Sequence, residues 1–414
     1  MMVKLVSKNF DIPHAHTLEV ARKNGRYASL EKLFTMSPDD VTTEVEKSGL
    51  RGKGGGGAAT GEKWRLISPK NTKPVYLVIN ADEGEPGTFK DRQILEFDPH
   101  LLIEGIICSS YAIGAHHTYV YVRGEYVFWI NRLQDAIDEA YKAGILGESV
   151  LGHPYTLHVT IHKGAGAYIC GEKTALLESL EGKRGHPRLK PKGKEPEWFF
   201  GNPTVVNNVE TIASVPYIIT EGSEAYRAYG TADSPGTMLF GISGHVERPG
   251  VYELPYGTSM KAVIYDLCGG IKGGKTLKAV IPGGSSVQIL RADEIEDITL
   301  DYESLKAHGS ALGTGGMIVM DESVSIPEVM KNLFEFYHHE SCGQCTPCRE
   351  GTGWVDRVLA KILAGKGTQE DFRTILDACD MLNGKTICVF APSVAFIAQS
   401  YIQKFREEFE ALLP

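Results

Sequence analysis

Four cysteines near the C-terminal end constrain the fold of this chain more than any other feature of its 414 residues. Cys342, Cys345 and Cys348 are each separated by two residues, and Cys388 follows in a loop between the last two predicted helices. Three closely spaced thiolates and a remote one are typical of a 4Fe-4S cluster, in which each thiolate binds one iron. Zinc, which usually takes two separated cysteine pairs, is the alternative, and four buried structural cysteines are a further one.

The N-terminus and the remaining cysteines indicate a reducing compartment. Residues 1–20 contain no apolar stretch of the kind that a secretory signal needs. The eight cysteines are therefore expected to be reduced, and a tight group of them indicates a metal site and not disulfide bonds. The four cysteines outside this group lie singly in largely apolar runs and are predicted to be small buried side chains. They are Cys108, Cys170, Cys268 and Cys379.

Charge and hydropathy exclude two classes of partner. The 43 basic and 52 acidic residues give a net charge of −9 without a long Lys/Arg run, so nucleic-acid binding is not expected. The most apolar stretches, 101–115 and 119–130, are interrupted by charged residues before they reach the roughly 18 residues of a membrane span. We therefore expect a cytoplasmic protein without direct membrane insertion.

The order of helical and strand patterns divides the chain into four regions. Residues 1–70 contain short helices and a Gly-rich loop, and residues 71–236 alternate between strands and helices, which favours an α/β sheet with ligand loops at the strand ends. Residues 237–323 combine short strands with glycine turns and indicate a small α+β unit. Residues 324–414 predict a four-helix bundle. Its helical patterns cover 326–340, 349–364, 369–383 and 392–413.

In the alternating region, each expected element has a clear hydrophobic period. Strands are predicted over 75–80, 118–123 and 156–162, and helices over 101–114, 130–143 and 172–180.

The first Gly-rich loop, Arg51–Gly57, formally contains the pattern G-x-G-x-x-G. Because the preceding residues 41–48 have a helical and not a strand pattern, the dinucleotide fingerprint is not confirmed there. Backbone N–H groups flanked by Arg51, Lys53 and Lys63 still suit a phosphate. A flexible hinge is the alternative.

Two further loops follow predicted strands. Gly164–Gly171 leads into a helix that begins near Glu172, so a ligand there would meet the N–H groups of a helix N-terminus. Tyr168 in this loop either packs on that ligand or belongs to the core. The loop Asn80–Gly87 offers carboxylates and an amide that suit the hydroxyl groups of a ribose or ribitol.

Taken together, these motifs resemble a known family of flavoproteins. The resemblance rests on SGLRGKGGGG with TGEKW, NADEGEPGTFKDR, GAGAYICGEKTALLESLEGKRGHPRLKP, NPTVVNNVETI, and ESCGQCTPCREG with TIC, in that order along the chain. The family is that of the NADH-oxidising F subunit of respiratory complex I, the 51 kDa-type flavoprotein, which also occurs as a module in bifurcating hydrogenases and formate dehydrogenases.

The resemblance implies a multidomain α/β fold. A Rossmann-like FMN/NADH domain is expected over 71–236, and a ubiquitin-like β-grasp (SLBB) module, which matches SGHVERPGVYELPYGTS, over 237–323. The four-helix bundle of 324–414 would hold the 4Fe-4S cluster on Cys342, Cys345, Cys348 and Cys388.

The resemblance also assigns residues to FMN and NADH. FMN would be held by Gly52, Gly54, Lys63, Asn80, Asp82, Glu83, Tyr168, Gly171, Glu172, Asn207 and Asn208. NADH would lie over the same flavin face and use the glycine run, with Lys53, Gly55 and Gly57, and the acidic turn with Glu85. Glu83 and Glu172 would have catalytic roles.

In this family, hydride passes from NADH to FMN, and the cluster then accepts single electrons. The resemblance implies two partner proteins, a thioredoxin-like 2Fe-2S protein (E-like) and a larger iron–sulfur electron-transfer protein. The cytoplasmic protein would act either by itself or as part of the peripheral arm of a membrane-associated complex, and the sequence leaves both settings open.

This chain departs from the family at the expected dinucleotide face. Ala58, Leu66 and Gly193 stand where relatives have aromatic residues, and Lys173 stands where they have a second Glu. We expect weaker base stacking, unless Trp198 or Phe199, or the charges of Lys192 and Lys194, compensate. The alternative function is an FMN/4Fe-4S electron relay that uses NADPH or a protein donor, and a metal-stapled scaffold without redox activity is a third possibility.

Overall fold

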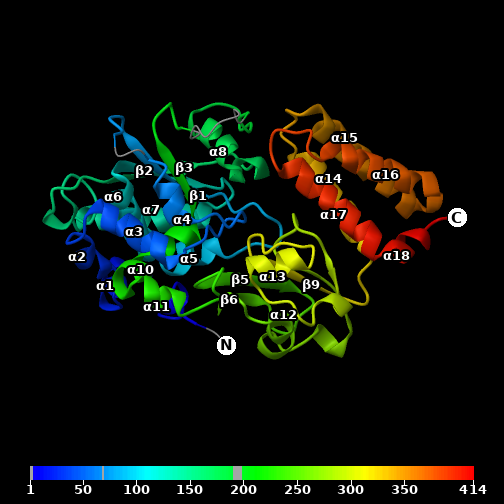
Figure 1. Ribbon diagram of the computed structural model, residues 1–414, viewed down its shortest axis with the longest axis horizontal. Coiled ribbons are helices and arrows are strands. Elements are labelled where there is room, and N and C mark those ends of the chain that lie inside the picture. The colour runs from blue at the N-terminus through cyan, green and yellow to red at the C-terminus, as the bar shows by residue number, and fades with distance from the viewer. Residues whose placement is uncertain (1–2, 68–69, 190–197) are drawn as a thin grey trace.

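The structure, a computed structural model, describes residues 3–67, 70–189 and 198–414 and contains two sheets and a group of C-terminal helices (Figure 1). The parallel sheet and its helices lie on the left of that view, the second sheet lies below the centre, and the C-terminal helices lie on the right. The expected mixed α/β architecture is confirmed. No helix within these three ranges is long and apolar enough to cross a bilayer.

The N-terminal helices are short. Their bounds are Leu18–Lys23 (α1), Ser29–Leu33 (α2), Pro38–Ser48 (α3) and Thr60–Trp64 (α4). α3 starts at Pro38 because the Ser37 hydroxyl accepts a hydrogen bond from the N–H of Asp40, whose carboxylate accepts one from the N–H of Ser37. Val41 and Val45 are buried in the core beside the parallel sheet and fix the start of the Gly-rich loop.

The first sheet is parallel throughout, with strand order β3-β2-β1-β4. Its strands are Val75–Ala81 (β1), Ala115–Val122 (β2), His158–Lys163 (β3) and Thr204–Asn208 (β4). The sequence predicts the first three. β4 has only Val205 and Val206 as apolar residues, and its pairing with distant β1 makes it a strand.

Helices cover this sheet. They are Asp91–Phe97 (α5), Pro99–Ile113 (α6), Val127–Lys142 (α7), Lys173–Leu180 (α8), Val209–Ala213 (α9), Val215–Glu221 (α10) and Ser223–Arg227 (α11). The predicted helices over 101–114, 130–143 and 172–180 are confirmed as α6, α7 and α8, with ends shifted by up to three residues.

The second sheet is mixed, with order β6-β5-β9-β7-β8. Its strands are Thr237–Gly244 (β5), Gly250–Pro255 (β6), Leu277–Ile281 (β7), Leu290–Arg291 (β8) and Gly316–Asp321 (β9). Only β5 and β9 pair in parallel. Short helices Met260–Ala262 (α12) and Tyr302–Ala307 (α13) accompany it. Two loops of this unit, around 286–288 and 310–314, reach the site described below.

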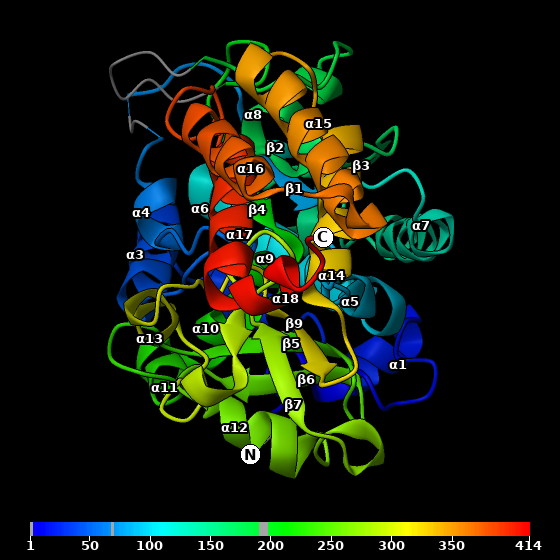
Figure 2. The same cartoon turned by 90° about the vertical axis from the view of Figure 1, so that its right-hand side faces the viewer.

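The C-terminal helices are Ile326–Glu340 (α14), Thr346–Lys361 (α15), Gln369–Leu382 (α16), Phe390–Lys404 (α17) and Arg406–Glu410 (α18). Consecutive members of α14–α17 pack together, and α14 also contacts α17. Figure 2, which looks from their side, shows them above the second sheet. The single helix predicted over 392–413 is wrong, because Phe405 leaves the helical conformation (φ −127°, ψ 30°) between α17 and α18.

Candidate functional site

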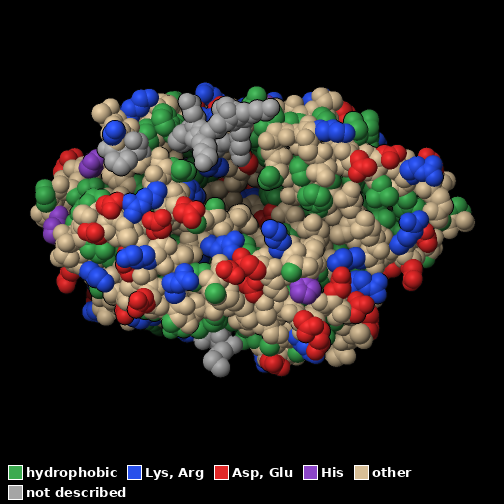
Figure 3. Space-filling model, viewed as in Figure 1, with side chains coloured by type: hydrophobic (Ala, Val, Ile, Leu, Met, Phe, Trp, Pro, Cys, Tyr) green, Lys and Arg blue, Asp and Glu red, His purple; other side chains and the backbone are tan. Residues whose placement is uncertain are grey.

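A cavity of about 560 Å³ opens where the parallel sheet, the second sheet and the C-terminal helices meet. The space-filling view shows a hollow near the middle of the face, with acidic and basic side chains around it (Figure 3). On the side of the parallel sheet, the lining residues come from the segments 53–56, 80–91 and 168–172 and from Asn208. In the two other regions, the lining residues come from the segments 286–288, 310–314 and 388–396.

The position of this cavity follows from the strand order. From β1 the chain continues to β2 on one side, while β4 lies on the other, so the connections diverge at the carboxyl ends of β1 and β4. Such a switch point is where open α/β sheets bind ligands. Asn80 and Asn208 are paired in register at these two ends, and both line the cavity.

The Gly-rich loop is held close to its neighbours. Gly57 has a φ of +63°, and a Cβ there would lie 2.5 Å from the ring of Tyr302, so a larger residue does not fit. Arg51 stacks on the same ring (3.9 Å to its centroid) and pairs with Glu303. Arg51 and Gly57, at the two ends of the loop, are therefore both held against Tyr302, which argues against the flexible hinge that was considered as the alternative.

The three cations predicted for phosphate binding differ in their partners. Arg51 is engaged with Glu303, and the fully buried Lys53 lies 3.2 Å from Glu210 and donates to Ser214 (2.7 Å). The Nζ of Lys63 donates to the carbonyl oxygen of Val206 (2.7 Å), and no carboxylate of the described residues pairs with it. Burial, together with the charge of Lys173, lowers the pKa of Lys63 to about 8. A bound phosphate would compensate this desolvated charge.

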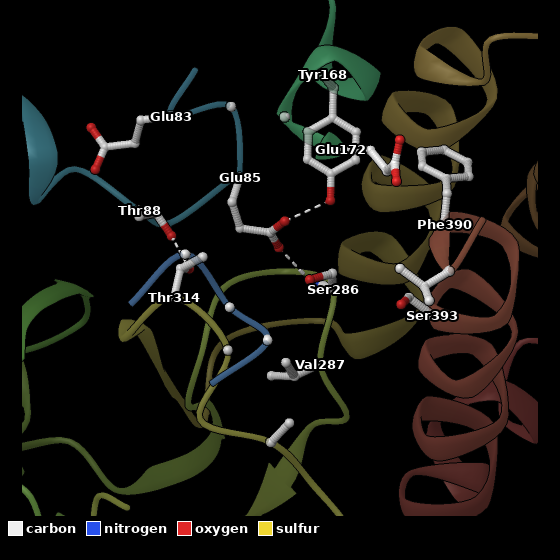
Figure 4. Close-up of a pocket in the computed structure, with 18 of the residues that line it drawn as sticks. Glu83, Glu85, Thr88, Tyr168, Glu172, Ser286, Val287, Thr314, Phe390 and Ser393 are labelled. Atoms are coloured by element: carbon white, nitrogen blue, oxygen red, sulfur yellow. Dashed lines mark hydrogen bonds between the residues drawn. The ribbon is translucent and has the colours of Figure 1, made fainter. Parts of the chain in front are cut away.

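Glu83 is a structural anchor for α5. Its carboxylate accepts hydrogen bonds from the N–H groups of Lys90 (2.7 Å) and Asp91 (2.8 Å), from Arg92 and from the hydroxyl of Tyr126. In the close-up, Glu83 points away from Tyr168 and Glu172 (Figure 4). The carboxylate therefore holds the start of α5 and the shape of the acidic turn.

Glu85 and Tyr168 face each other across the cavity wall. The Tyr168 hydroxyl donates to Glu85 (2.6 Å), and the N–H of Ser286 donates to the other carboxylate oxygen (2.6 Å), as Figure 4 shows. Burial raises the pKa of Glu85. The ring of Tyr168 packs against Phe336, Tyr337 and Phe390, so it belongs to an aromatic cluster while its hydroxyl group lines the cavity. The packing is that of the core alternative considered for Tyr168, and its contact with a ligand stays a prediction.

Glu172 forms the N-cap of α8. Its carboxylate accepts from the N–H and the hydroxyl of Thr174 and from the N–H of Ala175. The loop before α8 also carries Gly171, whose carbonyl oxygen accepts from the Asn80 side chain (2.9 Å). The helix N-terminus predicted beside the ligand is thus present, and its first turn is already capped by a carboxylate.

Two buried polar atoms at this site have no partner among the described residues: Oδ2 of Asp82 and Nδ2 of Asn207. Burial raises the pKa of Asp82 to about 7. Buried polar groups are normally hydrogen-bonded, so unpartnered ones beside a cavity suit a bound molecule with its own donors and acceptors. FMN, with a polar ring edge and a phosphate, fits this set of residues.

A second, small cavity contains all four predicted cluster ligands. Cys342, Cys345, Cys348 and Cys388 line it together with Ile169, Pro187, Gln344, Ile387 and Phe390. Burial and the neighbouring thiols raise the pKa of Cys348 and of Cys388 to about 11, so bound cations are needed to stabilise the thiolates. Among the described residues, no three His, Cys, Asp or Glu side chains converge on one ion. Four thiols around a shared space suit a cube better than zinc, since each binds a different iron.

The two cavities share part of their walls. Ile169, Cys388 and Phe390 line both of them, so a cluster ligand borders the larger cavity directly.

The structure brings most of the predicted cofactor residues to the larger cavity. Its lining includes Lys53, Gly54, Gly55, Asn80, Asp82, Glu83, Glu85, Tyr168, Gly171, Glu172 and Asn208. Gly52, Gly57, Lys63 and Asn207 are not in the lining. Leu66 is 62% exposed, and Lys192, Gly193 and Lys194 lie outside the described residues.

Sequence reasoning missed the wall on the opposite side. Ser286, Val287 and Thr314 come from loops of the second sheet, and Ser393 and Phe396 come from one face of α17. The glycine turn before Ser286 was the only signal, and it is not specific. The remaining cysteines, Cys108, Cys170, Cys268 and Cys379, are buried as predicted.

Comparison with known proteins identifies the matching families. Residues 45–217 match the Nuo51 FMN-binding domain, residues 238–319 the SLBB domain, and residues 328–412 the NADH-ubiquinone oxidoreductase-F iron-sulfur binding region. The chain thus contains an FMN-binding domain and a 4Fe-4S binding region, as predicted.

Close relatives match over nearly the whole chain. The F subunit of the NADH-quinone oxidoreductase of Mycobacterium bovis is 48% identical over 99% of this chain and 93% of its own length. The F 2 subunit of the NADH-quinone oxidoreductase of Rhizobium meliloti is 47% identical, over 99% of this chain and 98% of its own.

A solved structure, an NAD+-reducing NiFe-hydrogenase in the air-oxidized state, superimposes with a TM-score of 0.87 at 35% identity. The match covers 100% of this chain and 67% of that chain. On these similarities, the predicted family is confirmed, and the chain belongs to the F-subunit family of the NADH-quinone oxidoreductases.

Proposed function

We propose that this chain is the NADH-oxidising flavoprotein component of an NADH-quinone oxidoreductase. The observation that carries this function is the wall that the two cavities share through Ile169, Cys388 and Phe390. When bound, FMN exchanges a hydride for single electrons, and a 4Fe-4S cluster accepts these one at a time. A flavin site that borders a cluster ligand allows this exchange within one chain.

The residues of the larger cavity would bind and orient the cofactor and the dinucleotide. Lys63 would neutralise the FMN phosphate, and Asn80, Asp82, Asn207 and Asn208 would provide hydrogen bonds to the flavin.

The remaining members of the predicted set would shape and close the site. Gly52, Lys53, Gly54, Gly55 and Gly57 would bring backbone close to the ligand, and Gly171 would do the same before α8. Glu85, Tyr168 and Glu172 would face the nicotinamide side, while Glu83 would hold the acidic turn in place and act through it.

We further propose that the chain is divided as its sequence suggests. Residues 1–70 would be an N-terminal helical region, 71–236 a Rossmann-like FMN/NADH domain, 237–323 a ubiquitin-like module, and 324–414 a four-helix bundle that holds the cluster on Cys342, Cys345, Cys348 and Cys388. The partners would be a thioredoxin-like 2Fe-2S protein and a larger iron–sulfur protein. The setting would be the peripheral arm of a cytoplasmic, membrane-associated complex.

A second candidate donor is NADPH. Leu66 is exposed and Ala58 has no ring, so the base-stacking side chains of relatives are missing. The charges of Lys192 and Lys194, which lie outside the described residues, would pair with the additional phosphate.

Anaerobic mixing of the FMN-loaded chain with NADH or NADPH tests both candidates. The proposal expects NADH to bleach the flavin absorbance, and faster bleaching by NADPH would favour the second candidate. A flavin that neither dinucleotide reduces, although dithionite does, would contradict both and favour a protein donor.

A further inference from the structure

A hydroxyl group lies against one of the four cysteines of the smaller cavity. The Oγ atom of Ser341 is 3.2 Å from the Sγ atom of Cys348. Ser341 ends α14, and its N–H donates to the carbonyl oxygen of Tyr337 (3.1 Å). Ser341 belongs to the lining of neither cavity, so its hydroxyl group approaches the sulfur from outside the space that a cluster would fill.

The hydrogen bond between these two atoms has one possible direction when a cluster is bound. A cysteine that binds iron is a thiolate, which has no proton and can only accept. The oxygen of Ser341 also accepts from the N–H of Gly343 (3.4 Å), so one of its lone pairs is already used. The hydroxyl proton of Ser341 therefore points to the sulfur of Cys348.

Contacts on both sides of Ser341 fix its position. The preceding residue, Glu340, accepts a hydrogen bond from the N–H of Tyr168 (2.9 Å), which lies in the loop before α8. Beyond Ser341, Nη1 of Arg349 donates to the carbonyl oxygen of Gly343 (2.7 Å). A donor that is already held in place can stabilise a new negative charge with little rearrangement.

Cys348 is the most buried of the four predicted ligands, because the other three are only half-buried. A hydrogen bond is stronger in such surroundings than in water. On Cys345, by contrast, the donor is a backbone group, the N–H of Ile387 (3.4 Å). Ser341 is thus a donor that a substitution can remove while the backbone donor stays.

Reduction of the cluster increases the charge that this hydrogen bond meets. When the cluster gains an electron, part of the added negative charge lies on its thiolates. A donor to a thiolate therefore stabilises the reduced state more than the oxidised state, and hydrogen bonds to the sulfurs are among the factors that set the reduction potential of such clusters.

We propose that Ser341 is a positioning residue whose hydroxyl group, acting through Cys348, raises the reduction potential of the 4Fe-4S cluster. The cluster gains one electron from the reduced flavin, no bond to Ser341 forms or breaks, and the hydroxyl group keeps its proton. This role rests on the proposed function, which assigns the four cysteines to the cluster, and it adds a group that sets how readily the cluster accepts electrons.

Redox titration of the FMN-loaded full chain, followed by electron paramagnetic resonance of the reduced cluster, tests this role. Ser341→Ala should lower the ratio of reduced to oxidised cluster at a given potential by up to about tenfold, which is ~59 mV for a one-electron couple. Ser341→Thr keeps the hydroxyl group and should keep the midpoint, whereas Ser341→Val has the same shape without it and should lower the midpoint. Ser325→Ala, which removes the hydroxyl cap at the other end of α14, is the control.

Electron nuclear double resonance of the reduced cluster detects the hydroxyl proton itself. The native chain and Ser341→Thr should show a coupled proton that is lost soon after transfer to D₂O, because hydroxyl protons exchange faster than hydrogen-bonded backbone N–H groups. Ser341→Val should lack this proton. The slowly exchanging signal of the Ile387 N–H should remain in all three chains.

The outcomes separate the role of Ser341 from the proposed function. A native chain without an iron–sulfur cluster contradicts the function itself. A cluster with the same midpoint in the native chain, Ser341→Ala and Ser341→Val overturns the role of Ser341 alone. If the variants without the hydroxyl group lose their iron, the rapidly exchanging proton decides the question: its presence in the native chain and in Ser341→Thr supports the role, and its absence from the native chain contradicts it.

Discussion

The larger cavity takes its walls from segments spread over residues 53–396, whereas the four cysteines of the neighbouring cavity all lie between residues 342 and 388. The larger cavity contains charged groups that are mostly engaged with each other, and the smaller one contains thiols with apolar neighbours. A local motif specifies the second site, because a cluster needs only its four ligands in reach. The first site depends on the relative placement of two sheets and a helix.

The comparison predicts that the two sites can be damaged separately, and the largest effect is expected at the cysteines. Cys388→Ser should remove most of the iron, because one of four thiolates is lost, while FMN stays bound. Iron and sulfide analysis beside flavin absorbance measures both. Cys379→Ala, a change at a buried cysteine outside the cavity, should keep the iron. Zinc alone in the native protein would show that the cluster assignment is wrong.

The next effect concerns FMN binding. Lys63→Met should weaken FMN binding by about ten- to a hundredfold, since a charge-assisted hydrogen bond of about 1.5–3 kcal/mol is lost. Equilibrium dialysis of FMN against the full chain gives the dissociation constant, and iron content should not change. Lys47→Met, at an exposed position of α3, is the control. Equal affinities in both variants would mean that Lys63 does not contact the phosphate.

An aromatic side chain at position 58 tests whether the dinucleotide site lacks a stacking contact to a base. Ala58→Phe should strengthen NADH binding by about tenfold, because a stacked base gains ~1–3 kcal/mol. Ala58→Leu supplies bulk without a ring and should have a smaller effect. If the native affinity for NADH is already tight and the ring does not change it, the dinucleotide base lies elsewhere.

The smallest effect is a shift in the flavin potential. Lys173→Glu should lower the flavin midpoint potential, because a cation near the ring favours the reduced, anionic form. The same change should raise the pKa of Lys63, which the charge of Lys173 now lowers. Redox titration of the native chain and of Lys173→Glu measures the shift, and Lys142→Glu, a change at an exposed position of α7, is the control. An unchanged or higher midpoint would place Lys173 away from the flavin.

A region can be predicted from the sequence when the contacts that build it join residues that are close together in the chain. The cysteine spacing, the Ser37 cap and strands β1 to β3 depend on neighbours in the chain, and they were predictable. β4 depends on its pairing with β1, and α18 beyond the break at Phe405 contacts α14, which is distant in the sequence, so neither feature has a local pattern.

The candidate site shows the same division. The glycine and acidic loops were predictable as motifs. The hydrogen bonds of Glu83 to N–H groups at the start of α5 and the ion pair of Lys53 with Glu210 were not. The wall formed by Ser286, Val287 and Phe396 had no specific signal, because these residues become neighbours only when three regions pack together.

The central claim is that the two cavities form one path for electrons across the wall that Ile169, Cys388 and Phe390 share. Rapid mixing of the anaerobic native chain with NADH, followed by flavin absorbance and by electron paramagnetic resonance of frozen samples, tests it directly. The account predicts that bleaching of the flavin is followed by the signal of a reduced 4Fe-4S cluster, and that Cys388→Ser shows the bleaching without that signal. A flavin that bleaches while the native cluster stays oxidised, although dithionite reduces it, would contradict the account.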